Sequence, residues 1–254
     1  MKLRKSEGGG AFSNAVDAAL FTDLYELTMA QAYVADGMDG REATFSTYFR
    51  TLPTGRNFLL ACGLDTVLTH LENLRFKDEA VKYLASLDRF SPPFLDWLRN
   101  YRFSGEVRAV QEGTPIFPHE PVLEITAPIA EAQIVETFVL NQIHLQTLLA
   151  SKATRLVAAA AGRPVVDFGA RRIHGIDAAV KAPRAFAIAG VSGTSNVLAG
   201  YTYGLSVIGT MAHSYVQAFS SEAEAFRAFV RHYPSTTLLV DTYDTLEGVR
   251  NVVR

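Results

Sequence analysis

Cysteine is nearly absent from this sequence, and so are long apolar runs. The one thiol, Cys62, cannot form an internal disulfide, and a single cysteine among 254 residues is typical of a reducing compartment. The longest apolar-looking stretch, LLASKATRLVAAAAG, contains Lys152 and Arg155 and is too polar to span a bilayer. The basic N-terminal residues are not followed by the apolar segment of a secretory signal. We therefore expect a cytoplasmic protein that has no membrane partner.

An excess of charge of one sign is also missing. The 26 acidic and 24 basic side chains leave a formal net charge of -2, which argues against a nucleic-acid partner. The sequence has no P-loop and no GxGxxG pattern, so the usual nucleotide fingerprints do not apply. One cysteine and six histidines without paired spacing predict no zinc site and no metal-ligating residues. Small molecules and further copies of the chain remain as the expected partners.

Apolar residues are plentiful, at 48% of the chain, and suffice for one large domain or two ordinary ones. Residues 1–12 contain GGG and predict a flexible leader. Residues 13–128 predict a mixed α/β domain. Its expected elements are a helix from Asn14 to Gly37, strands at ATFSTYFR, GEVRAV and PVLEITAP, and two or three short helices between Leu59 and Arg99.

Residues 129–254 show a different pattern of apolar and polar segments. A long helix is expected from Ala130 to Ala161, and the apolar runs VVDF, AFAIAG, LSVIG and TLLVD then alternate with polar turns and helices. This order predicts a buried parallel sheet with polar residues just beyond each strand. A complete α/β barrel needs roughly 250 residues, so we expect part of a barrel or a short open sheet. Because TLEGVRNVVR carries no helix-stop signal, we expect the C-terminal half of this domain to be missing.

Two of the predicted strand ends carry candidate binding groups. DFGARR brings Phe168 and Arg171 together, an aromatic face and a guanidinium fork that matches phosphate or carboxylate oxygens. A helix-start ion pair and a core phenylalanine are the alternative. GVSGTSN, which contains Ser195, is a small-residue turn able to present backbone N–H groups to an anion, and it is equally compatible with an ordinary turn.

The next two strand ends carry His213 and Asp241. GTMAHS starts a helix at His213, where an imidazole can act as acid, base or phosphorylated nucleophile. Asp241 follows in VDTYDT, and a carboxylate beside an imidazole fixes its tautomer and raises its basicity. A purely structural histidine, an N-cap role for Asp241 and simple packing of Tyr243 are the alternatives.

Four motifs together, TDLYELTMAQAY, DFGARR, GTMAHSYVQAF and LLVDTYDTLEGVRN, resemble the nicotinate phosphoribosyltransferase family. The resemblance implies a type II phosphoribosyltransferase: an α/β domain on an irregular α/β (TIM-like) barrel, working as a homodimer with shared active sites. It further implies ATP-coupled synthesis of nicotinate mononucleotide from nicotinate and 5-phosphoribosyl 1-pyrophosphate, in NAD salvage by the Preiss–Handler route. Mg2+ is the implied cofactor and ATP the co-substrate.

The resemblance also implies residue roles in the second half of the chain. His213 would be the phosphorylated histidine that links ATP use to phosphoribosyl transfer, and Asp241 would orient it. Thr210 would lie close to the pyridine ring, and Ser214 belongs to the same substrate-binding motif.

The binding roles implied for the remaining residues concern the base and the phosphates. Phe168 and Tyr25 would cover the two faces of the ring, with Tyr25 supplied by the neighbouring subunit, and Arg171 would hold phosphate oxygens. Related nicotinamide-using enzymes carry an aspartate where this chain has Ser195. Because that carboxylate would repel nicotinate, Ser195 predicts nicotinate as the preferred base.

One departure from the family limits the expected activity. An Arg-x-Asp-Ser-Gly motif and a glycine-rich phosphate site do not occur before Arg254. We therefore expect little or no activity from these residues alone, and an inactive fragment or pseudoenzyme that only binds or dimerises is the alternative function. A quinolinate-type enzyme is a weaker interpretation, because a diacid substrate calls for a more basic pocket and no phosphohistidine motif.

Overall fold

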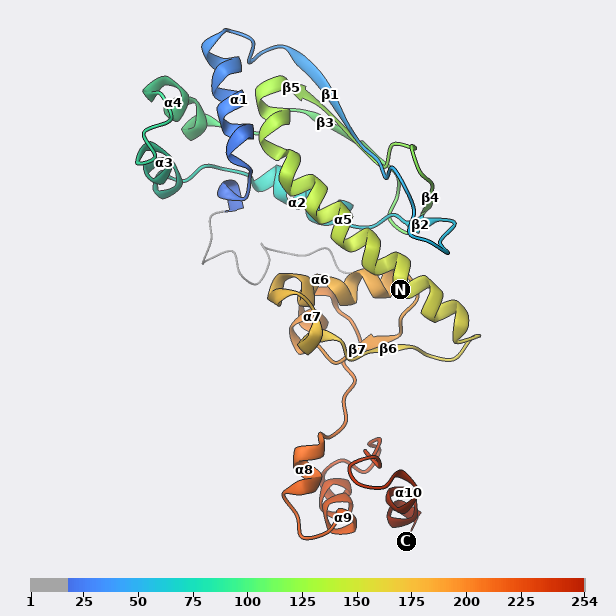
Figure 1. The fold of residues 1–254 in the computed structure, drawn as a ribbon. Helices are drawn as coiled ribbons and strands as arrows, with labels where there is room; N and C mark the ends of the chain where they lie inside the picture. Colours follow the sequence, from blue (N-terminus) through green and yellow to red (C-terminus); the bar gives the residue numbers. More distant parts are fainter. Residues whose placement is uncertain (1–17, 254) are drawn as a thin grey trace. The chain divides into compact units, whose positions relative to one another are not determined.

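The computed structural model describes residues 18–253, which form two units: unit 1 extends to Ser206, and unit 2 begins at Val207. Each unit is described by itself (Figure 1). The predicted leader, residues 1–12, and the start of the predicted first helix, residues 14–17, lie outside the described residues.

A three-stranded antiparallel sheet forms in unit 1 because apolar residues alternate along its strands. The strands, in the order in which they pair, are β1 (Glu42–Thr47), β5 (Leu123–Pro128) and β3 (Glu106–Ala109). On the central strand Leu123, Ile125 and Ala127 are buried, and Phe45 lies opposite Ile125. Because every second side chain points to the same side, this face of the sheet lies on the core. The three strands predicted within residues 43–128 are confirmed. A second antiparallel pair consists of β2 (Leu59–Leu60) and β4 (Pro115–Ile116).

Helices pack on this sheet and on one another (Figure 1). They are η1 (Ala18–Leu20), α1 (Leu24–Ala35), α2 (Leu64–Asn73), α3 (Asp78–Ala85), α4 (Pro92–Asn100) and α5 (Ile129–Ala159). The helix predicted from Asn14 begins only at Leu24, because Asp23 caps α1 in a reciprocal capping box with Glu26. On α4 the ring of Trp97 stacks on Phe94, with centroids 5.7 Å apart and an interplanar angle of 12°.

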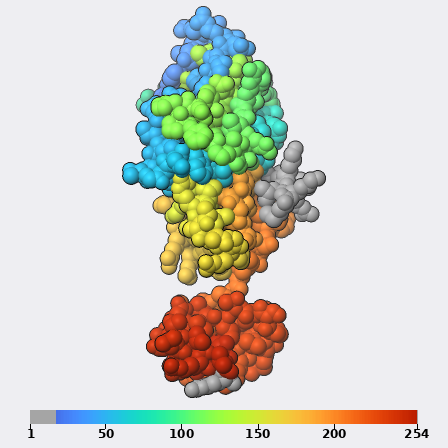
Figure 2. All heavy atoms as spheres, turned by 90° about the vertical axis from the view of Figure 1, so that its right-hand side faces the viewer, coloured from blue at the N-terminus to red at the C-terminus, as the bar shows by residue number. Residues whose placement is uncertain are grey.

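The long helix α5 confirms the prediction for residues 130–161 and connects both parts of unit 1. Its first half carries Ile134, Val135 and Val139 into the core that α1 and the sheet share. Its second half packs Ala150 against Ala185 of the following segment. The space-filling view shows these last turns in yellow beside the orange atoms of that segment (Figure 2).

The remainder of unit 1 is a short α/β segment. Its elements are β6 (Val166–Asp167), η2 (Ala170–Arg172), α6 (Gly175–Ile188), β7 (Gly193–Thr194) and α7 (Val197–Tyr203). The strand predicted at AFAIAG is wrong, because most of that run is the end of α6. Ala178, Ala182 and Ala185 recur at helical spacing and are buried on one face, and a short apolar run does not distinguish a buried strand from a buried helix.

Unit 2 consists of α8 (His213–Gln217), α9 (Glu222–His232) and α10 (Thr245–Val253). The strand predicted at TLLVD does not form. Leu238, Leu239 and Val240 instead pack their side chains on a small core that includes Val216 and Phe226. The apolar character of the run is therefore satisfied by side-chain burial without a hydrogen-bonded partner strand.

The strand predicted at LSVIG, Leu205–Gly209, is also not a strand of the structure. Within unit 1 the Thr194 N–H donates to the Ser206 carbonyl at 3.0 Å, and the Leu205 N–H donates to the Gly200 carbonyl at 3.2 Å. The fold class is mixed α/β, as predicted, and β6 and β7 are parallel, as expected after the long helix. Residue 129, where a second domain is predicted to start, is the first residue of α5, and both this domain boundary and a partial barrel stay predictions.

Candidate active site

The ends of β6 and β7 bring the motifs DFGARR and GVSGTSN side by side. The two strands pair in parallel with Asp167 opposite Thr194, so the residues that follow each strand leave the sheet at the same edge. The Asp167 carboxylate accepts hydrogen bonds from the Thr194 hydroxyl and from the Gly169 N–H, both at 2.8 Å. The Ser195 N–H donates to the Asp167 carbonyl at 2.8 Å. Asp167 and Thr194 thereby hold both loops.

Phe168 and Arg171 face outward from this edge. The Phe168 ring is 52% exposed, so it is available for stacking and is not a core side chain. Arg171 lies in η2 and is exposed, and among the described residues no carboxylate forms an ion pair with it. The helix-start ion pair that the sequence left open is therefore not formed, and the guanidinium can meet an anion.

The turn that contains Ser195 is built by Asn196 and Thr194. Asn196 caps α7 by accepting the Ala199 N–H at 3.1 Å, and its amide donates to the Ala179 carbonyl at 2.9 Å. The buried Thr194 hydroxyl accepts the Asn196 N–H at 3.1 Å. Thr194 and Asp167 were not predicted as supports for the turn. Polar residues at adjacent strand ends were the available signal.

His213, Thr210, Ser214 and Asp241 all lie in unit 2 and are exposed. His213 is the first residue of α8, and its Nδ1 atom lies 3.3 Å from the Thr242 hydroxyl. The recorded contact of the ring is thus to the residue after Asp241, and orientation of His213 by Asp241 stays a prediction. The Thr210 hydroxyl donates to the Thr237 carbonyl.

The residues near Asp241 test two alternatives, an N-cap role for Asp241 and simple packing of Tyr243. Asp244, not Asp241, caps α10, because its carboxylate accepts the Glu247 N–H at 2.8 Å. Tyr243 is 67% exposed, so packing does not account for its presence in the motif. Asp241 is left without a capping role among the described hydrogen bonds, consistent with a side chain that is available to a ligand.

Tyr25 lies near the start of α1 (Figure 1). Its ring is 50% exposed. Desolvation and the negative charges of Glu136, Glu26 and Asp23 raise the pKa of its phenol. The sandwich of a ring between Phe168 and Tyr25 of a neighbouring subunit stays a prediction.

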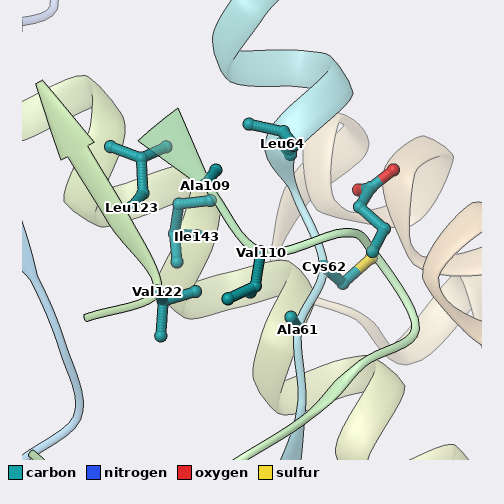
Figure 3. Close-up of a pocket in the computed structure, with 9 residues that line it drawn as sticks. Ala61, Cys62, Leu64, Ala109, Val110, Val122, Leu123 and Ile143 are labelled. Atoms are coloured by element: carbon teal, nitrogen blue, oxygen red, sulfur yellow. The ribbon is translucent and has the colours of Figure 1, made fainter. Parts of the chain in front are cut away.

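The small pocket near β2 has too little room for a substrate. It has a volume of about 10 Å³ and is lined by Ala61, Cys62, Val110 and Val122 among others (Figure 3); a space of this size holds about one water molecule. Within residues 18–253 no group of three or more His, Cys, Asp or Glu side chains is arranged to hold a metal ion. None of the helices described is both long and apolar enough to cross a membrane.

Known proteins resemble this chain over most of its length. A family model described as the nicotinate phosphoribosyltransferase (NAPRTase) N-terminal domain matches residues 20–144. The chain is 61% identical over 235 residues to nicotinate phosphoribosyltransferase pncB2 of Mycobacterium tuberculosis, covering 92% of this chain and 50% of that protein. It is 39% identical over 237 residues to the nicotinate phosphoribosyltransferase of Bacillus subtilis, covering 93% and 48%.

A solved structure supports the likeness in three dimensions. The crystal structure of human nicotinic acid phosphoribosyltransferase matches with a TM-score of 0.84 and 30% sequence identity, covering 91% of this chain and 57% of that chain. The chain spans about half the length of the curated relatives that it matches.

Proposed function

The chain belongs to the nicotinate phosphoribosyltransferase family, and from this premise we propose that the complete protein joins nicotinate to 5-phosphoribosyl 1-pyrophosphate. The products are nicotinate mononucleotide and pyrophosphate, a step of NAD salvage. The observation that carries the proposal is the 61% identity over 235 residues to a protein named for this activity. The arrangement at the ends of β6 and β7 supports it, because an exposed ring and a free guanidinium suit a planar, anionic substrate.

The binding roles proposed for unit 1 follow from this arrangement. Phe168 stacks on one face of nicotinate, and Tyr25 of a second subunit covers the other face in a homodimer. Arg171 binds phosphate oxygens of the phosphoribosyl substrate, because its fork matches them in a bidentate manner. Ser195 faces the carboxylate of the base, and its hydroxyl has no recorded protein partner among the described residues.

The role proposed for unit 2 is the coupling to ATP. His213 receives a phosphoryl group from ATP, since it begins a helix, is exposed and has a polar contact at one ring nitrogen. Asp241 holds the ring in the reactive orientation, and Thr210 and Ser214 line the substrate side. Asp241 is exposed and makes no capping bond among the described residues, which leaves it available for this role.

Mg2+ is proposed to arrive with the pyrophosphate and with ATP. The described residues hold no preformed cluster of three acidic or histidine ligands. The proposal does not require such a cluster, because Mg2+ keeps several waters and is bound through substrate phosphates with one or two carboxylates. A cytoplasmic location is proposed on the single cysteine and the intracellular substrates.

The test of ATP coupling uses the complete protein and measures nicotinate mononucleotide and ADP together. We expect ATP to raise product formation in a fixed ratio, and His213→Ala to abolish phosphate labelling of the protein and break this ratio. His232→Ala is the matched control, because this histidine lies at the end of α9 without a motif. A protein that makes no product with or without ATP contradicts the proposed activity and supports the binding-module alternative.

The test of base choice compares nicotinate with nicotinamide. Ser195→Asp is expected to shift the preference toward nicotinamide by about tenfold or more, because a carboxylate repels the nicotinate carboxylate. Ser192→Asp adds the same charge at an exposed position of the same loop and is expected to leave the preference unchanged. A wild-type preference for nicotinamide would overturn the role of Ser195.

A further inference from the structure

A fully buried carboxylate stands directly beside Tyr25. Glu26 has 0% of its surface exposed. One of its oxygens, Oε2, accepts from the Thr22 hydroxyl and from the Asp23 N–H at 3.3 Å. The other, Oε1, accepts from the Thr137 N–H at 3.1 Å and lies 2.9 Å from the Thr137 hydroxyl, whose one proton it shares with Asp23 Oδ2 at 2.8 Å. Each oxygen therefore faces at least one backbone N–H, a donor that cannot turn into an acceptor.

These hydrogen bonds join the first turn of α1 to the middle of α5. Thr137 belongs to α5, and the Thr22 hydroxyl, whose one proton is shared between Glu26 and α5, lies 3.1 Å from the Ile134 carbonyl oxygen. Phe21 adds an edge-to-face contact with Phe138, with ring centroids 6.3 Å apart. Because α5 is anchored in the core of unit 1, the contacts of Glu26 determine where α1 begins.

The charges around Glu26 give a reason to look beyond helix capping. Asp23 and Glu136 are the acidic neighbours, and no lysine or arginine forms an ion pair with Glu26 in the described part of the chain. Burying a carboxylate without a cation is costly, and burial raises the pKa of Glu26 although its hydrogen bonds oppose the change. A cap needs only an exposed carboxylate, so the burial of this one calls for a further explanation.

The phenol of Tyr25 supplies that explanation. Its hydroxyl lies 3.5 Å from Glu26 Oε1, the same oxygen that accepts from α5. We propose that Glu26 is a positioning residue for Tyr25, which ties the start of α1 to α5 and so fixes the place of the exposed phenol. This inference rests on the proposed function, in which the Tyr25 ring covers one face of the base.

The variant that tests this role is Glu26→Gln. Glutamine preserves the volume, but in either orientation its NH2 group meets a backbone N–H, of Asp23 or of Thr137, so one donor loses its acceptor. Glu136→Gln is the matched control, because it removes a nearby negative charge from α5 and leaves the bonds between α1 and α5 in place. Thr137→Val is a milder second variant, which keeps the backbone donor and removes the hydroxyl.

The first measurement needs no substrate. In protein with 13C-labelled tyrosine, the Tyr25 resonance is assigned by its loss in Tyr25→Phe. At neutral pH we expect Glu26→Gln and Thr137→Val to shift or broaden this resonance, and Glu136→Gln to change it less. An unchanged Tyr25 resonance in a folded Glu26→Gln protein overturns the proposal, whatever the activity of the enzyme.

The second measurement is kinetic and uses the complete protein. Glu26→Gln is expected to raise KM for nicotinate by about fivefold or more, with a smaller effect on KM for 5-phosphoribosyl 1-pyrophosphate. In the Tyr25→Ala background, Glu26→Gln is expected to raise KM for nicotinate by less than about twofold, because the phenol that Glu26 positions is gone. Equal effects in both backgrounds would mean a general structural role and would overturn the inference. If the wild-type protein does not use nicotinate, the proposed function fails, and the resonance of Tyr25 still decides the position.

Discussion

The buried ion pair of Arg184 and Glu112 links α6 to the loop between β3 and β4. Arg184 is 6% exposed, and its guanidinium donates to the two Glu112 oxygens at 2.9 and 2.6 Å. Glu112 also accepts the Gly63 N–H at 2.6 Å. Burial alone raises the pKa of Glu112, but the hydrogen bonds and charge of Arg184 outweigh burial and lower it. The pair is therefore held as ions inside unit 1.

Removing one partner of this pair is expected to cost more than removing both. Arg184→Met leaves the Glu112 carboxylate buried without its cation, and we expect the free energy of unfolding to fall by about 3–5 kcal/mol. The double variant Arg184→Met, Glu112→Leu leaves no buried charge and is expected to lose less. Urea denaturation followed by circular dichroism measures both. A double variant less stable than the single one would contradict the prediction.

Protonation of the His70 imidazole makes the free energy of unfolding depend on pH. The imidazole stacks on Phe138, with centroids 3.5 Å apart, and burial with the positive charge of Lys181 lowers its pKa to about 4. Because the folded protein binds the proton less readily than the unfolded chain, this contribution is complete above about pH 6.5 and is lost as pH falls toward 4.

The expected loss from His70 is about 1–2 kcal/mol between pH 7.5 and pH 5, allowing for its partial exposure. His70→Phe, which keeps a ring against Phe138, is expected to flatten this part of the stability curve. His119→Phe is the control, since this exposed histidine has no comparable stack on α5. An identical pH dependence of wild type and His70→Phe would show that other groups cause the acid loss.

At the level of elements, the sequence predicted best where one periodic signal ran long. The long helix predicted for residues 130–161 is α5, Ile129–Ala159, and the alternation in PVLEITAP gave a strand with its buried face correct. AFAIAG failed because a short alanine-rich run has no distinguishing period. TLLVD failed because a strand needs a partner, and Leu238–Val240 pack by their side chains instead. The tie of Glu26 to Thr137 spans 111 residues, a distance at which local patterns carry no information.

The start of α2 depends on a glycine that faces α5. Gly63 has φ +109°, and a Cβ there would lie 2.8 Å from the Gln142 carbonyl oxygen. Gly63→Ala therefore combines backbone strain with a clash against a helix backbone that cannot move aside, and we expect a loss of about 2–4 kcal/mol in the free energy of unfolding.

Gly37→Ala is the matched control for Gly63→Ala. Gly37 has φ +65° at the end of α1, but a Cβ there meets nothing within 4 Å. The control isolates the cost of the left-handed backbone, which is about 1 kcal/mol. Thermal or urea denaturation of the two variants measures the difference. Equal losses would mean that the approach of α2 to α5 is not tight.

At the scale of the whole molecule, the sequence predicted only part of the way in which its motifs come together. DFGARR and GVSGTSN meet at one sheet edge, as polar residues after adjacent parallel strands should. The supports of that edge, Asp167 and Thr194, were not predicted, because their pairing depends on a register that the sequence does not reveal. His213 and Asp241 lie in unit 2.

The aromatic stack on α4 determines what the intrinsic fluorescence of this protein can report. Trp97 is the one tryptophan of the sequence, and it lies against Phe94 within unit 1. Fluorescence excited at wavelengths where tyrosine barely absorbs comes from Trp97 and therefore reports on unit 1 alone. A melting curve recorded this way does not detect the unfolding of unit 2. Placing a tryptophan at Phe229, which packs between Tyr215 and Tyr233 in unit 2, would give that unit its own optical signal.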